Sequence, residues 1–161
     1  MKFRVFAVGA TAAVALLGLQ PGPASAQTTT KTYQVAFVGT ADQVQDPTNV
    51  SGTIDSKFAG TCRQTGTGTV TQEPNGGIHS LLIVDWKCKD GTIKVRSEGS
   101  IPPGGTEIVN GQWSVLPGST GRYTGATGGG GHDCLGGGHG GSAVTGVVHW
   151  EGQITLRKTH L

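Results

Sequence analysis

Residues 144–157, which read VTGVVHWEGQITLR, decide the fold of this chain. The apolar side chains fall on alternate positions, at Val144, Val148, Trp150, Ile154 and Leu156. Most of the intervening positions carry polar side chains, at Thr145, His149, Glu151, Gln153, Thr155 and Arg157. This two-residue period is typical of a β-strand with one buried and one exposed face. The predicted strand is long enough to wrap around part of a barrel.

Alternation with a two-residue period is common in the rest of the sequence after residue 26, as in 33–37. No helical period of apolar residues persists there for more than a turn or two. Asn75-Gly76 and Asp90-Gly91 are strong hairpin signals, and Pro102-Pro103-Gly104-Gly105 marks another turn. We expect strands over 31–40, 50–59, 61–72, 78–88, 92–100, 106–116, 120–127 and 143–158. The sequence therefore predicts an all-β protein with a single antiparallel barrel of about eight strands; a β-sandwich is the alternative.

The first 26 residues have the layout of a secretory signal peptide. Lys2 and Arg4 precede an apolar run over 5–19, and the run is followed by Ala24-Ser25-Ala26. The run is too short for a transmembrane helix, so no membrane span is expected. Cleavage after Ala26 would leave one domain over 27–161, located in the periplasm or the medium.

The charge balance of the chain disfavours a nucleic-acid partner. The chain has 12 basic and 10 acidic residues, and Lys2 and Arg4 would leave with the signal peptide, so the exported part has 10 of each. No basic stripe is present, and we expect no nucleic-acid partner.

Three cysteines lie in the exported part, where an oxidising compartment favours one disulfide and one remaining thiol. A hairpin turn centred near Asn75-Gly76 places Cys62 almost opposite Cys88 on neighbouring strands. We therefore predict the disulfide Cys62–Cys88, with Cys134 outside it.

The segments QWSV at 112–115, GSTGRYTGATG at 118–128 and GQI at 152–154 carry a resemblance to a known family. They resemble the allene oxide cyclase/dirigent β-barrel superfamily, and the bacterial secreted members of unknown activity are the most similar. The resemblance implies an eight-stranded barrel with a mostly apolar central cavity, and a homo-oligomer, since the plant members are often trimers. It carries over no catalytic residue.

Residues 128–141 read GGGGHDCLGGGHGG, and their glycine density predicts a mobile loop. His132, Cys134 and His139 have ligand types suited to zinc or copper, but ordering so flexible a loop around an ion is costly. We therefore expect no metal. The tract 124–129 superficially matches a dinucleotide-binding loop, but the glycines cannot open the helix that such a loop requires, so no cofactor is expected.

Five aromatic residues are candidates for lining the barrel interior: Tyr33, Phe37, Trp86, Trp113 and Trp150. They either pack as a core or surround a cavity for a flat, apolar ligand, and an eight-stranded barrel can be filled or hollow. The alternation places His149, Glu151 and Glu98 outward and shows no inward charge, which disfavours an enzyme.

Three functions stay open at this point. The first is a secreted barrel that binds an apolar small molecule, and the second is an isomerase or cyclase of the allene oxide cyclase type. The third is a structural envelope or interaction protein. A barrel packed solid by its tryptophans would favour the third over the other two.

Overall fold

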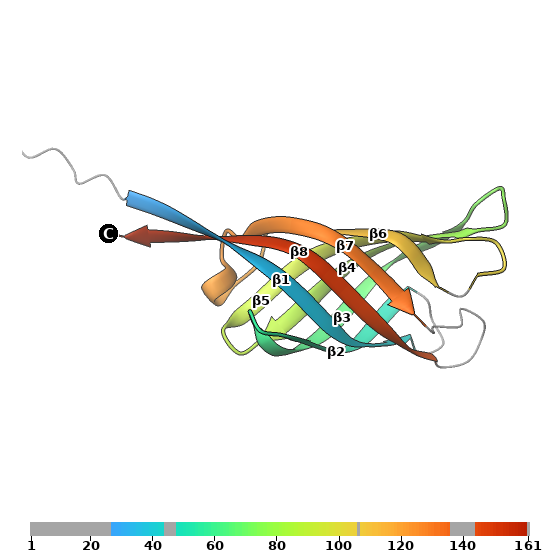
Figure 1. The fold of residues 1–161 in the computed structure, drawn as a ribbon, viewed down its shortest axis with the longest axis horizontal. Coiled ribbons are helices and arrows are strands. Elements are labelled where there is room, and N and C mark those ends of the chain that lie inside the picture. The colour runs from blue at the N-terminus through green and yellow to red at the C-terminus, as the bar shows by residue number, and fades with distance from the viewer. Residues whose placement is uncertain (1–26, 44–47, 106, 136–143, 161) are drawn as a thin grey trace, which may run out of the picture.

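The protein forms a closed antiparallel barrel of eight strands in the computed structural model, which describes residues 27–43, 48–105, 107–135 and 144–160 (Figure 1). The elements are β1 (Gln27–Gln43), β2 (Asn49–Ser56), β3 (Gly60–Gln72), β4 (Ile78–Cys88), β5 (Gly91–Ile101), β6 (Ile108–Val115), the 3₁₀ turn η1 (Gly121–Tyr123), β7 (Thr127–Leu135) and β8 (Val144–His160). Each strand pairs with the next, and β8 returns to β1. The predicted barrel is confirmed, and the predicted signal peptide lies outside the described residues.

The connections define two ends of the barrel. At the terminal end lie Gln27, His160, the tight turns after β2 and β4, and the segment that contains η1. At the distal end β1, β3, β5 and β7 finish and β2, β4, β6 and β8 begin. β1 and β8 pair along 27–43 and 144–160, and their outermost residues run beyond the barrel as a two-stranded ribbon (Figure 1).

The glycine-rich segment differs from its prediction. Residues 128–135 belong to β7, which pairs with β6 on one side and β8 on the other, and 136–143 lie outside the described residues. The strand expected over 120–127 is mostly η1 and a turn. The glycines are needed because neighbouring backbones lie close: a Cβ on Gly130 would lie 1.9 Å from the carbonyl oxygen of Glu151.

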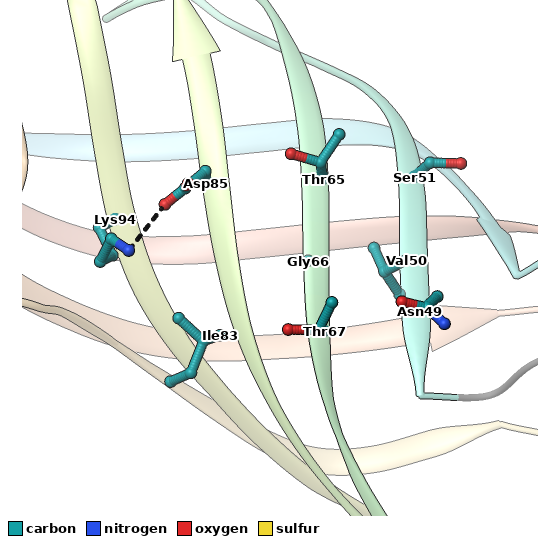
Figure 2. Close-up of a pocket in the computed structure, with 9 residues that line it drawn as sticks. All are labelled: Asn49, Val50, Ser51, Thr65, Gly66, Thr67, Ile83, Asp85 and Lys94. Carbon is teal, nitrogen blue, oxygen red and sulfur yellow. Dashed lines mark ion pairs between the residues drawn. The ribbon is translucent and has the colours of Figure 1, made fainter.

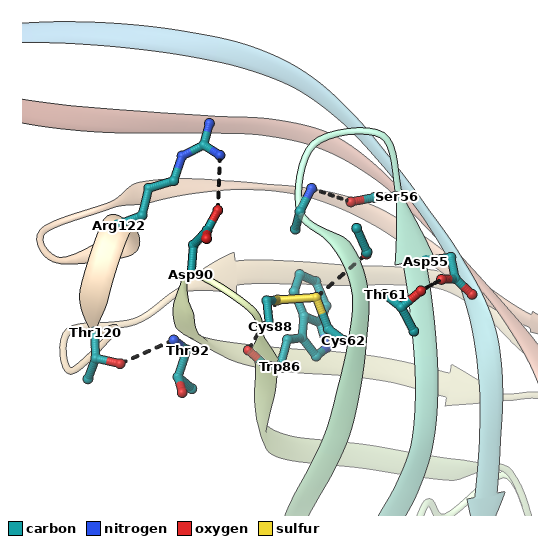
Figure 3. Close-up of a disulfide and its surroundings, with 12 residues drawn as sticks. Asp55, Ser56, Thr61, Cys62, Trp86, Cys88, Asp90, Thr92, Thr120 and Arg122 are labelled. Atoms are coloured by element: carbon teal, nitrogen blue, oxygen red, sulfur yellow. Dashed lines mark hydrogen bonds and ion pairs between the residues drawn. A yellow bond between two sulfur atoms is a disulfide. The ribbon is translucent and has the colours of Figure 1, made fainter.

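The terminal end is closed by a disulfide and a small aromatic cluster. Cys62 and Cys88 are bonded, as predicted, and join β3 to β4 beside the buried Trp86 (Figure 3). Phe58 packs between Tyr33 and the buried Tyr123, with ring centroids 5.1 Å and 5.9 Å away. Across the turn after β4, Arg122 forms an ion pair with Asp90 (Figure 3).

Helices contribute almost nothing to this fold. In the part of the chain that the structure describes, no helix is long and apolar enough to span a membrane.

Candidate functional site

Four of the five predicted aromatic residues pack against one another inside the barrel. Phe37, Trp86, Trp113 and Trp150 are each 4 % exposed or less. Trp86 is central, with ring centroids 4.6 Å from Phe37, 5.6 Å from Trp113 and 5.1 Å from Trp150. Tyr33 is half-buried at the terminal end, against Phe58. These side chains therefore fill the interior where they lie.

A small cavity of about 30 Å³ lies inside the barrel beside this cluster. Its lining combines aliphatic side chains with four polar ones and Trp150: Val50, Gln64, Leu82, Val84, Ser97, Ile108, His132, Cys134, Val148 and Trp150. Of the predicted aromatic residues, Trp150 lines this cavity. Val50, Ile108 and Val148 come from the parts of their strands toward the distal end, so the cavity lies on that side of the cluster.

Ser97 and His132 form a hydrogen-bonded pair at this cavity. Ser97 Oγ of β5 lies 3.0 Å from His132 Nε2 of β7, across the short strand β6. The His132 ring stacks on Trp150 at 4.5 Å between centroids. Gly111 of β6 makes room for the ring, because a Cβ there would lie 2.4 Å from His132 Cε1.

Burial sets the charge state of the two titratable groups in the cavity. Desolvation lowers the pKa of His132, while the backbone of Glu98 and the carboxylate of Asp133 act more weakly in the opposite direction. Burial raises the pKa of the Cys134 thiol, and Asp133 and Glu107 add to the increase. The site therefore favours a neutral imidazole and a neutral thiol.

Three polar atoms on the cavity-lining residues have no hydrogen-bond partner among the described residues: Gln64 Oε1, His132 Nδ1 and Trp150 Nε1. The other end of the Gln64 amide is held in place, since Nε2 donates to the carbonyl of Thr40 at 2.8 Å. Trp86 Nε1 and Tyr123 Oη are also buried and unpartnered, but neither residue lines the cavity. Unpartnered buried atoms are rare, and their clustering here needs an explanation.

Several sequence predictions are corrected at this site. His132 and Cys134 are not in a solvated loop, since both face the interior and are at most 9 % exposed. His132 is an inward-facing ionisable group, which the sequence analysis did not find. Glu98, His149 and Glu151 do lie on the outer wall, where Glu98 pairs with Arg96 and His79.

Two of the three metal candidates, His132 and Cys134, lie in the described part of the chain. His139 lies outside the described residues. Within the described ranges, no group of three or more histidine, cysteine, aspartate or glutamate side chains could hold an ion.

Sequence reasoning missed Gln64 and Ser97. A usable signal was present for Ser97, which continues the alternation of Ile93 and Val95 on β5, so its side chain is expected to face inward. Gln64 likewise continues the inward position of Cys62 on β3.

A larger hollow of about 450 Å³ lies on the outer wall over β2 to β5 (Figure 2). Hydroxyl and amide groups line it together with Ile83 and an ion pair between Asp85 and Lys94, whose charged atoms are 3.5 Å apart. Its volume is larger than that of the inner cavity. The charged groups that line it, on Asp85 and Lys94, already pair with each other.

Comparisons of the chain with family models, with curated proteins and with solved structures gave no match. Its function is therefore inferred from the site itself.

Proposed function

We propose that the protein is an exported barrel that binds a small, largely apolar molecule at the distal side of its interior. The observation that supports this best is that Gln64, His132 and Trp150, which line one cavity, each have an unpartnered buried polar atom. A buried polar atom without a hydrogen bond costs about 1–3 kcal/mol. A ligand with one hydrogen-bonding group would recover part of that cost, while the aliphatic lining would hold its apolar part.

The packing limits where such a ligand can lie. The cavity of about 30 Å³ has room for about two water molecules, at roughly 10–15 Å³ each. A larger ligand requires the aliphatic side chains of Val50, Leu82 and Ile108 to move apart. The ligand position is thus beside the tryptophan cluster, not among the tryptophans as the sequence suggested.

Export is part of the same proposal. It is supported by the charged start, apolar run and Ala-Ser-Ala ending of residues 1–26. The disulfide Cys62–Cys88 agrees with it, because such bonds persist in oxidising compartments.

An isomerase or cyclase is the second candidate, and the Ser97–His132 pair favours it. A neutral imidazole 3.0 Å from a hydroxyl can accept a proton as a general base. The resemblance to the allene oxide cyclase superfamily supports the same function. The third candidate, an envelope or interaction protein, is favoured by the solid packing of the aromatic cluster.

Native mass spectrometry of protein recovered from its export compartment tests the proposal. We expect a bound small molecule in the wild type, and at least a tenfold weaker retention in His132→Phe, which keeps a ring against Trp150 but removes both nitrogens. Gln153→Leu, on the exposed face of β8, is the matched control and should retain the ligand.

The outcomes separate the three functions. A wild type without a bound molecule contradicts ligand binding and leaves the envelope function. Equal retention by His132→Phe shows that the ligand does not use this site. The recovered compound can also be incubated with the protein and tested for isomerisation. If the wild type isomerises it and His132→Phe does not, the protein is an enzyme and not a carrier.

A further inference from the structure

One edge of β1 is open along much of its length. Every residue of β1 has a partner on β8, but the pairing with β2 covers Val38 to Asp42 alone among the described residues. β2 ends at Ser56, so within the described structure residues 30–37 of β1 have no ladder partner on the side away from β8. In an antiparallel ladder alternate residues direct their N–H and C=O groups to each side, so this edge presents backbone groups available for another strand.

Residues 32–37 of the open edge lack the devices that usually block strand addition. They read TYQVAF, with no charge, no proline and no glycine, and Lys31 precedes them. Edge strands are normally protected by lysine, proline or a bulge, and the pairing of β1 with β8 is regular over this stretch. A segment of this composition has a high tendency to form intermolecular β-structure.

Space for another strand lies beside this edge. A groove of about 680 Å³ runs between β1 and the turn from β2 to β3. It is lined on one side by Gln34, Ala36 and Val38, which face outward, and on the other by the turn residues Ser56, Lys57 and Phe58. An added strand would lie about 4.8 Å from β1, within this groove.

Exposed apolar side chains gather at the same place. The large hydrophobic residues that are exposed in the described part of the chain are Val38, Ile83 and Val147. Val38 is 51 % exposed and lines the groove, and Val147 lies on β8 opposite Thr40 of β1. Two of the three thus lie on the outer face of the β1–β8 pair.

We propose that this edge pairs with the same edge of a second copy of the chain, antiparallel and across a two-fold axis. Such an interface is isologous, so one segment must be complementary to itself, and an uncharged segment meets this condition. With the axis near Gln34, Lys31 lies opposite Phe37 and no two like charges face each other. Val38 of each copy would be covered at the rim of the joined sheet.

Sedimentation measurements on the purified protein test this interface. We expect a dimer that dissociates on dilution. Gln34→Lys places two like charges opposite each other at the axis, and should raise the dissociation constant at least fivefold, the equivalent of about 1 kcal/mol. Gln34→Glu should do the same, and a mixture of the two variants should recover the dimer. Thr69→Lys, at an exposed position of β3, is the control and should remain dimeric.

Hydrogen exchange on the unmodified protein gives a second test, independent of any variant. Alternate amides of 32–37, those that point away from β8, should exchange faster as the protein is diluted, while the other amides of this stretch and those of β4 should not change. A wild type that is monomeric at its highest soluble concentration would overturn the proposal. A dimer whose β1 exchange is independent of dilution, or whose stability is insensitive to charge at Gln34, would overturn it as well.

Discussion

His132 contributes both to the packing of the barrel interior and to the chemistry of its cavity. Its ring is stacked on Trp150, bonded to Ser97 and accommodated by Gly111. One ring nitrogen remains without a partner within the described structure. The same burial that holds the ring in place also disfavours its charged form.

This burial predicts a pH-dependent stability. The pKa of His132 is lowered from its ordinary 6.5 in the folded chain, so the unfolded chain binds the proton first as the pH falls. The free energy of unfolding should therefore decrease below about pH 6.5, by at most about 1.4 kcal/mol per pH unit for this one proton. Denaturant titrations of wild type and His132→Phe from about pH 8 to about pH 5 measure the difference. Identical pH curves for the two proteins would contradict the prediction.

At the scale of the strand, β7 shows how glycine permits close backbone contacts. Gly130→Ala places a Cβ 1.9 Å from the carbonyl oxygen of Glu151, so β7 and β8 must separate. We expect a loss of about 3 kcal/mol in the free energy of unfolding. Gly131→Ala is the matched control, since its nearest contact is 3.7 Å away and its site is exposed. Equal destabilisation of both variants in a denaturant titration would contradict this explanation.

The hairpin of β3 and β4 should depend on its disulfide. Cys62 and Cys88 are separated by 26 residues in sequence, and a crosslink over a loop of this length contributes about 3 kcal/mol. Reductant should lower the unfolding midpoint of the wild type accordingly. The double variant Cys62→Ala, Cys88→Ala should start at a lower midpoint and should not respond to reductant. A midpoint that is unchanged when the two thiols are released would show that the hairpin is held by its other contacts.

The two strands also show what a sequence can and cannot reveal. Turn chemistry placed Cys62 nearly opposite Cys88, and the observed register, with Arg63 paired to Lys87, makes them direct neighbours. In β7 the alternation is hidden, because Gly128 to Gly131 have no side chains that could show it. That strand is specified by its neighbours β6 and β8, through pairing that no local pattern encodes. The inward position of His132 could not be predicted without this pairing.

For the whole molecule, the barrel could be predicted, but how its interior is filled could not. Alternation predicted seven of the eight strands where they lie, whereas β7 was predicted as a loop and the strand expected over 120–127 is mostly η1 and a turn. Hairpin turns predicted the antiparallel order. Whether Trp86, Trp113 and Trp150 surround a cavity or fill it depends on how the rings tilt against one another, which the sequence does not determine.

Cleavage of the predicted signal peptide would change the length of the whole molecule. Cleavage after Ala26 should give a protein that begins at Gln27, the first residue of β1. Intact-mass analysis of protein from the periplasm or the medium should find the chain shortened by its first 26 residues. A protein that retains Met1 there would refute the cleavage.

The pairing of Gln27 with His160 has a topological consequence. Because β1 and β8 are neighbours in the ring of eight, Gln27 and His160 lie side by side, and no strand is the structural start of the barrel. In a protein that begins at Gln27, a short linker from the residues after His160 back to Gln27 would make the backbone circular without changing any strand pair. New ends could then be opened in the exposed turn at 102–105, where chain breaks are well tolerated. The order of the strands along the gene would change, but their order around the barrel would not.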